Sequence, residues 1–312
     1  MSIANRLVYG AALVELAAQD PNIVVVDSDF GRAAGYEAFW QKYPDRYFNC
    51  GIAEQGMCSV AVGLASCGLT AFACSFAVFT SMRALDQVRN GAALYDLNVK
   101  FVGSHAGIET AKDGATHQSV EDIAIMRSLP NMKVLAPCSP NQTAALTRLM
   151  AQTPGTFYIR FGREESEERY AADQVFTLGG SCELRCGTDV AILTYGRMVD
   201  MALEAAEILA GQGVSARVVD MYSIKPFDRA AVLRAATQTK GIVTAEDHSV
   251  IGGLGGAVAE YLSETRPTLV RRVGMPDCYG RSGTSSDLRA LYGLTAEAIC
   301  REALGMIQNT IH

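Results

Sequence analysis

One carboxylate in this chain has unusual surroundings. Glu54 opens a predicted helix directly after the glycine-bearing segment 49–53, and the next charged residue along the chain is Arg83. An acid at a helix start complements exposed backbone N–H groups, so Glu54 has a purely structural interpretation. A carboxyl group inside a long uncharged stretch is also desolvated, which gives an acid unusual proton affinity. The residues alone leave both interpretations open.

A polar loop holds a second candidate group. His105 and His117 are two of the four histidines in the chain, and Asp113 lies between them. A single histidine is usually structural. Two histidines and an acid among glycines, which let a ligand approach the backbone closely, favour a functional site. Histidine exchanges protons near neutral pH, so loop 104–118 predicts proton transfer or hydroxyl binding.

Alternating strands and helices are needed to position these groups. In the first half, helices are predicted at 6–18, 79–95, 120–129 and 140–151, with one further helix ending at residue 39 and another beginning at residue 54. Strands are predicted at 23–26, 70–74, 98–103, 133–136 and 156–161. This alternation predicts a parallel sheet with helices on both faces. Asp29 and His105 each follow a strand, at the carboxyl edge where open α/β sheets bind ligands.

A second, smaller unit of the same kind follows an acidic run. Residues 164–169 are predicted to form a solvated connector. Beyond it, strands are predicted at 189–195, 216–221, 241–245 and 268–273, with helices at 199–210, 228–236, 255–263, 288–291 and 296–307. The expected fold class is α/β, with two three-layer α/β/α domains built on mainly parallel sheets. Their expected bounds are 1–165 and 186–312, with a connector at 166–185.

The composition argues against several classes of function. A net charge of −6 and an isoelectric point near 5.3 argue against a surface for nucleic acid or anionic membranes. Nine cysteines without a C-x-x-C pair indicate reduced thiols in a cytoplasmic protein. No histidine pair has helical metal-ligand spacing, so this chain alone is expected to hold no metal. The uncharged stretch from Gln55 to Met82 could be mistaken for a membrane span, but Gly63 and Gly68 interrupt it.

The segment Gly51-Ile52-Ala53-Glu54-Gln55 resembles the glutamate motif of thiamine-diphosphate enzymes of the transketolase superfamily. The resemblance implies that Glu54 binds N1′ of the cofactor's aminopyrimidine ring and promotes its imino tautomer. That tautomer removes the proton from the thiazolium carbon. Phe76 and Phe79 have the spacing of ordinary core residues, but the family uses this run as the aromatic wall against the pyrimidine.

The histidine loop is similar to the transketolase pattern Ser-His followed by Asp-Gly-x-Thr-His-Gln. The resemblance implies that His105 and His117 contact the sugar hydroxyls and the carbonyl being made or broken. It assigns substrate binding to Asp113, and Asp29 at the neighbouring strand end is expected to contact substrate as well. Enzymes that make deoxyxylulose phosphate share much of this loop.

Two arginines match the family's phosphate-binding arginines. Arg6 corresponds to the first and Arg163 to the second, with Arg160 as the nearby alternative. Guanidinium groups suit phosphate oxygens. Ala33 stands where the family carries a serine or similar donor, with Arg32 beside it, so Arg6 and Arg163 are expected to carry most of the anion binding.

The resemblance covers essentially the whole chain, but only the back half of a full-length transketolase. The Gly-Asp-Gly motif that holds magnesium and the diphosphate in this superfamily is absent from the sequence. The chain is therefore expected to be the pyrimidine-binding subunit of a split transketolase. A diphosphate-binding partner subunit would supply the Mg²⁺ ligands, in an expected α2β2 assembly that includes self-association. The expected substrates are sugars, with a phosphorylated ketose as donor.

Three alternatives remain open at this stage. The chain resembles, more weakly, a deoxyxylulose-phosphate synthase and the β-subunit of a 2-oxo-acid dehydrogenase. A catalytically silent assembly subunit is the third possibility. The presence of Glu54, His105, Asp113 and His117 together argues against the silent subunit.

Overall fold

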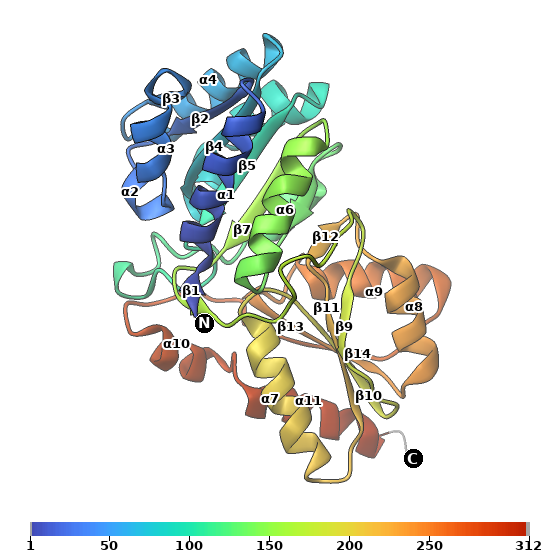
Figure 1. Ribbon diagram of the computed structural model, residues 1–312. Helices are drawn as coiled ribbons and strands as arrows, with labels where there is room; N and C mark the ends of the chain where they lie inside the picture. Colours follow the sequence, from blue (N-terminus) through green and yellow to red (C-terminus); the bar gives the residue numbers. More distant parts are fainter. Residues whose placement is uncertain (1, 310–312) are drawn as a thin grey trace.

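The computed structural model describes residues 2–309 and contains two main sheets (Figure 1). The larger sheet has seven strands in the order β12-β6-β7-β5-β4-β2-β3. The strands are β2 (Ile23–Asp27), β3 (Tyr47–Asn49), β4 (Thr70–Phe76), β5 (Val99–Ser104), β6 (Lys133–Leu135), β7 (Phe157–Phe161) and β12 (Ser223–Lys225). Neighbouring strands are parallel except where β12 runs antiparallel to β6 at one edge.

The smaller sheet has five strands in the order β14-β13-β10-β11-β9. The strands are β9 (Cys182–Arg185), β10 (Val190–Thr194), β11 (Ala216–Asp220), β13 (Ile242–Ser249) and β14 (Val270–Met275). Here too only the edge strand β9 is antiparallel to its neighbour. A short antiparallel ribbon joins β1 (Ile3–Ala4) to β8 (Glu165–Ser166).

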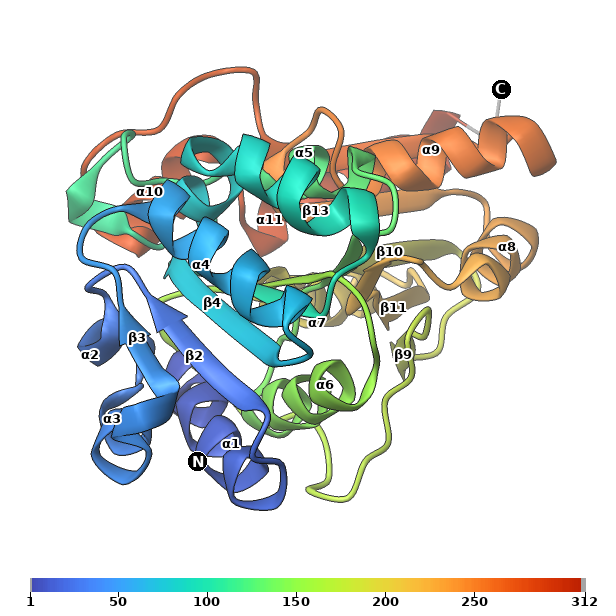
Figure 2. The ribbon, with the colours of Figure 1, turned by 90° about the horizontal axis from the view of Figure 1, so that it is seen from above.

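Helices cover both faces of the first sheet, because its central strands are apolar on both sides. Val25 packs in the core beneath α1, whereas Val24 and Val26 pack in the core beneath α4. Figure 2 shows α1, α3 and α6 on one side of β2 and β4, with α4 and α5 on the other. The helices are α1 (Asn5–Gln19), α2 (Gly31–Ala34), α3 (Glu37–Lys42), α4 (Glu54–Ser66), α5 (Asp122–Ser128) and α6 (Pro140–Gln152).

The second sheet is covered in the same way. Ala191 and Leu193 of β10 belong to the core that includes α8 and α9, and Val190 and Ile192 belong to the core that includes α7 and α11. The helices are α7 (Met198–Ala210), α8 (Arg229–Gln238), α9 (Leu254–Thr265), α10 (Ser285–Tyr292) and α11 (Ala296–Asn309). The core beneath α4 continues without a break into the second sheet. The predicted fold class, two three-layer α/β/α units with mainly parallel sheets, is confirmed.

The helix predicted over 79–95 is present but irregular. It contains two π-helical segments, Phe79–Arg83 and Gln87–Ala92, and ends in a 3-10 turn at Ala93–Tyr95. The wider turn is closed by a bond from the Ala84 N–H to the Phe79 carbonyl at 3.2 Å. It keeps Phe79 and Arg83 on one face, where the guanidinium carbon lies 3.9 Å from the ring centroid.

The acidic run at 164–169 is not simply a solvated connector, because some of its side chains form ion pairs with the second half of the chain. Glu165 and Ser166 pair with β1. The Glu164 carboxylate forms an ion pair with Arg289 at 3.1 Å, and Arg169 pairs with Asp200 at 2.7 Å. The charges of this run therefore fasten the first half of the chain to the second.

Three edge strands were not predicted from the sequence, and the first of them is β3 (Tyr47–Asn49). β9 lies within the segment expected to be a connector, and β12 crosses from the second half of the chain to complete the first sheet. Among the helices described between residues 2 and 309, none is long and apolar enough to cross a membrane.

Candidate active site

The segments that follow the carboxyl ends of β4 and β5 bring four of the predicted site residues together. The ring of Phe76 lies 4.9 Å from the His105 ring and 5.4 Å from the His117 ring, measured between centroids. Phe79 lies 5.6 Å from Phe76 and 5.2 Å from His117. Both histidines therefore contact one aromatic wall, although they lie twelve positions apart in the sequence.

Phe30 completes this wall and was missed by the sequence analysis. Its ring lies 4.4 Å from Phe76 and 5.2 Å from His105. The fully buried Asp27 fixes the turn, because its carboxylate accepts the backbone N–H groups of Phe30 and Gly31 and the hydroxyl of Tyr47 at 2.6 Å. The Asp27-Ser28-Asp29 strand end was the available signal, but it pointed to Asp29 rather than to the phenylalanine.

His105 is held as a neutral imidazole. Its side chain is buried, its Nδ1 lies 2.9 Å from the Ser104 hydroxyl, and its backbone has a φ of 57° in the left-handed region. Burial, followed by the positive charges of Arg6 and Arg163, lowers the pKa of His105 to about 3. At neutral pH this ring is suited to donate or accept a hydrogen bond without carrying a charge.

Glu54 is the first residue of α4 and is only 3% exposed. Its carboxylate forms an ion pair with the Arg83 guanidinium at 3.0 Å. The same guanidinium lies over the ring of Phe79, so Arg83 joins the buried acid to the aromatic wall. Only the tertiary fold reveals this contact, since 29 positions separate the two residues.

The donor set fits the pyrimidine half of thiamine diphosphate. A buried carboxylate can share a proton with a ring nitrogen, and the flat faces of Phe76 and Phe79 suit an aromatic ring. The diphosphate half needs a cation, and residues 2–309 contain no group of three or more His, Cys, Asp or Glu side chains able to hold a metal ion.

Arg163, the predicted second phosphate-binding arginine, and its alternative Arg160 have different environments. Arg163 is exposed, and its carbonyl accepts a hydrogen bond from the Arg6 guanidinium. Burial and then the charge of Arg163 lower the pKa of Arg6, because two cations lie close together. Arg160 is buried and pairs with Asp122 at 3.3 Å. Arg163 is thus accessible to an anion, and Arg160 is not.

Asp29 and Asp113 both have exposed side chains. Asp29 has a φ of 62° and accepts a hydrogen bond from the Asn49 side chain at 3.0 Å. It borders a cavity of about 610 Å³ that Arg32 and Trp40 also line. Asp113 ends the 3-10 turn Ala111–Asp113 in the histidine loop.

Comparison with known proteins identifies both halves of the chain. The family described as "Transketolase, pyrimidine binding domain" matches residues 1–168, and "Transketolase, C-terminal domain" matches residues 180–299. The chain is 45% identical over 298 residues to a 6-deoxy-6-sulfo-D-fructose transketolase subunit of Clostridium sp., covering 96% of this chain and 92% of that protein. It is 40% identical over 307 residues to an apulose-4-phosphate transketolase subunit of Phocaeicola vulgatus, covering 98% of both.

A solved structure extends the similarity to three dimensions. The structure described as a split-gene transketolase, inactive β4 tetramer, superposes with a TM-score of 0.90 at 43% sequence identity. The superposition covers 99% of each chain. On the evidence of both family matches and of full-length relatives at 40–45% identity, this chain belongs to the transketolase family.

Proposed function

We propose that this chain is the pyrimidine-binding subunit of a split transketolase, which moves a two-carbon ketol unit from a ketose to an aldose. The observation that carries the proposal is the buried Glu54, joined through Arg83 to an aromatic wall that both His105 and His117 contact. The proposed complex is an α2β2 assembly in which the partner subunit binds the diphosphate and Mg²⁺. The names of two relatives, each a transketolase subunit, support a shared site.

Each residue of the chain has a proposed task. Glu54 would hold the ring nitrogen of the pyrimidine and exchange a proton with it, and Phe76 and Phe79 would exclude water from that ring. When bound, thiamine diphosphate would supply the electron sink that allows the bond between carbons 2 and 3 of the ketose to break. His105 and His117 would bind the substrate carbonyl and hydroxyls and move protons there, with Asp29 and Asp113 holding hydroxyls at the entrance.

The proposed donor is a ketose with an anionic end. Arg6 and Arg163 carry two close positive charges, which a phosphate or sulfonate would neutralise. The two relatives support this class, since the names of their sugars include a sulfo group in one case and a phosphate group in the other.

The remaining proposals concern organisation and location. We place the pyrimidine-binding domain at 1–165, the connector at 166–185 and the C-terminal domain at 186–312, supported by the family matches to 1–168 and 180–299. A cytoplasmic location is supported by nine cysteines that all lie outside disulfides.

Reconstitution tests the function directly. The purified chain alone should give no ketol transfer, and activity should appear when the diphosphate-binding subunit, thiamine diphosphate and Mg²⁺ are added. The inactive β4 assembly named for the 43% identical structure supports the first half of this expectation. The measurement is turnover of a panel of phosphorylated, sulfonated and uncharged ketoses. Activity of the single chain would refute the split site, and a complex that turned over no ketose would refute the transketolase assignment.

Arg163→Ala should raise the KM for an anionic ketose more than it lowers kcat. Losing a charged hydrogen bond costs about 1.5–3 kcal/mol, which corresponds to roughly a 10- to 150-fold change. A contact remote from the reacting carbon is made equally in the ground and transition states, so KM should change most. The carbonyl of residue 163, which accepts the Arg6 bond, is retained in this variant.

Two comparisons make the Arg163 test specific. Arg148→Ala removes an exposed arginine that pairs with Glu15 on the helices α6 and α1, and this variant should keep the wild-type KM. An uncharged ketose should be unaffected by Arg163→Ala. Equal losses on charged and uncharged ketoses would mean that Arg163 supports the fold rather than the anion.

A further inference from the structure

The loop that carries His105 depends on contacts beyond its own residues. His105 and Gly107 both have positive φ, at 57° and 67°, a region that a non-glycine residue such as His105 enters at a cost. A segment in this conformation persists only when its surroundings fix it. Within the first domain, the Ala106 N–H bonds the Phe161 carbonyl at 3.2 Å and the Gly107 N–H bonds the Ser119 carbonyl at 2.8 Å.

The next backbone group is held from the second domain. The Ile108 N–H donates to both carboxylate oxygens of Asp247, at 3.1 and 3.3 Å. Asp247 also lies directly against Gly107, where an added Cβ would come within 1.9 Å of Oδ2. Because only glycine leaves room for this contact, carboxylate and loop fit each other closely.

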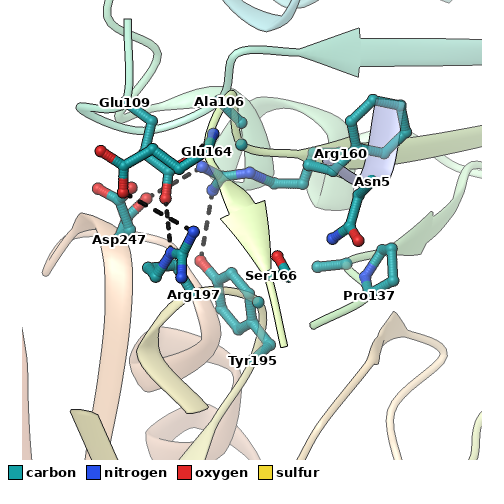
Figure 3. A pocket seen from close by; sticks show the side chains of 14 residues that line it. Asn5, Ala106, Glu109, Pro137, Arg160, Glu164, Ser166, Tyr195, Arg197 and Asp247 are labelled. Carbon is teal, nitrogen blue, oxygen red and sulfur yellow. Dashed lines mark hydrogen bonds and ion pairs between the residues drawn. The ribbon is translucent and has the colours of Figure 1, made fainter. Parts of the chain in front are cut away.

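Asp247 is itself rigidly placed. It lies in β13, is 8% exposed, and its backbone carbonyl accepts a hydrogen bond from Arg160 at 3.0 Å. Figure 3 shows Asp247 gathered with Glu109, Arg160 and Arg197 where the two halves of the chain meet. The Arg197 guanidinium pairs with Glu109 at 3.0 Å, so the segment just beyond Ile108 is also tied to the second domain.

We propose that Asp247 is a positioning residue, which fixes the backbone of segment 105–108 and thereby the imidazole of His105. This inference rests on the proposed role of His105, since Asp247 itself would contact neither substrate nor cofactor. It gives the C-terminal domain a part in the active site, although every proposed catalytic side chain comes from the first domain.

The hydrogen bond does not depend on the charge of the acid. Burial, opposed by the charge of Arg160, raises the pKa of Asp247 to about 7. A protonated carboxyl group still has a carbonyl oxygen that accepts the Ile108 N–H. The conservative variant Asp247→Asn keeps such an oxygen, whereas Asp247→Ala removes it.

Amide hydrogen exchange of the full chain tests the contact without any substrate. Asp247→Ala should speed exchange at Ile108 at least tenfold, and Asp247→Asn should stay within threefold of wild type. The matched control is Glu246→Ala. Glu246 is the adjacent buried acid, and its carboxylate instead accepts the N–H groups of Leu254 and Gly255 at the start of α9. The control should speed exchange at 254–255 and leave Ile108 unchanged.

Kinetics of the reconstituted complex test the consequence. A misplacement of about 1 Å can cost on the order of 100-fold in rate, so Asp247→Ala should lower kcat about 10- to 100-fold. The affinity for thiamine diphosphate should change less than threefold, and Asp247→Asn should restore kcat. If Asp247→Ala does not fold, Asp247→Ser replaces it in both experiments. The serine hydroxyl ends one bond short of the positions of the carboxylate oxygens, so it does not make the same hydrogen bond to the Ile108 N–H.

Three results would overturn the proposal: unchanged exchange at Ile108, a wild-type kcat in Asp247→Ala, or an Asp247→Asn variant as impaired as the alanine. Failure of the proposed function looks different. A wild-type complex without ketol transfer would refute that function, while the exchange experiment would still decide whether Asp247 holds the loop.

Discussion

Glu54→Gln is expected to abolish most ketol transfer, with a rate loss of about 10²–10⁴-fold, while the chain folds normally. The amide has nearly the shape of the acid, so the α4 start and the Arg83 contact should tolerate it sterically. What the amide lacks is a proton that it can exchange with a ring nitrogen. The measurement is the turnover of the reconstituted complex, with unfolding of the variant followed by circular dichroism.

The chain offers a matched control for the Glu54 experiment. Glu37 is also an acid in the first turn of a helix, but it is exposed. Glu37→Gln should therefore leave turnover unchanged. If Glu54→Gln kept turnover within a few-fold of wild type, Glu54 would be a helix-start charge like Glu37, and the proposed cofactor site would be wrong.

Arg160→Met should be among the most destabilising substitutions, costing about 3–5 kcal/mol of unfolding free energy. Arg160 and Asp122 are 5% and 0% exposed in their side chains and lie 3.3 Å apart. Removing the arginine leaves a buried carboxylate whose remaining bonded partner is the Tyr158 hydroxyl at 2.7 Å. Arg160 also bonds the Asp247 carbonyl, so the loss should reach the contact between the two domains.

Urea unfolding of single and double variants checks the origin of this effect. Arg160→Met combined with Asp122→Asn removes the uncompensated charge while an amide oxygen still accepts the Tyr158 hydroxyl. The double variant should therefore recover part of the lost stability. Losses that simply add would show that the ion pair is not the cause. Arg163→Met, which alters an exposed arginine, should change stability by less than about 0.5 kcal/mol.

The fold was predictable from the sequence because its signals are local. Runs such as Ile23–Asp27 are short, apolar and bounded by polar residues, as strands buried on both faces must be. The edge strand Ser223–Lys225 has no such pattern, and its pairing with β6 depends on a contact almost ninety positions away along the chain. The central strands were therefore predicted well, whereas β3, β9 and β12 at the sheet edges were not predicted as strands.

The candidate site divides in the same way. Glu54, His105 and His117 were predicted because the motifs around them resemble transketolase motifs, whereas the residue types alone left the role of Glu54 open. Phe30 and Asp247 look like ordinary residues in sequence. Their importance comes from distances to His105 and Ile108 that only the folded chain brings about. Arg163 was the predicted anion-binding arginine and Arg160 the alternative, and burial and the partner Asp122 argue against Arg160.

The crossing strand β12 also bears on how such a gene can be divided. β12 is encoded in the second half of the chain but completes the sheet of the first, and Lys225 donates to the carbonyls of Arg127 and Leu129 at the end of α5. If the two matched domains were encoded by separate genes, the seven-stranded sheet of the first domain would lose its edge strand β12 to the other polypeptide. Selection should therefore keep these two domains on one polypeptide.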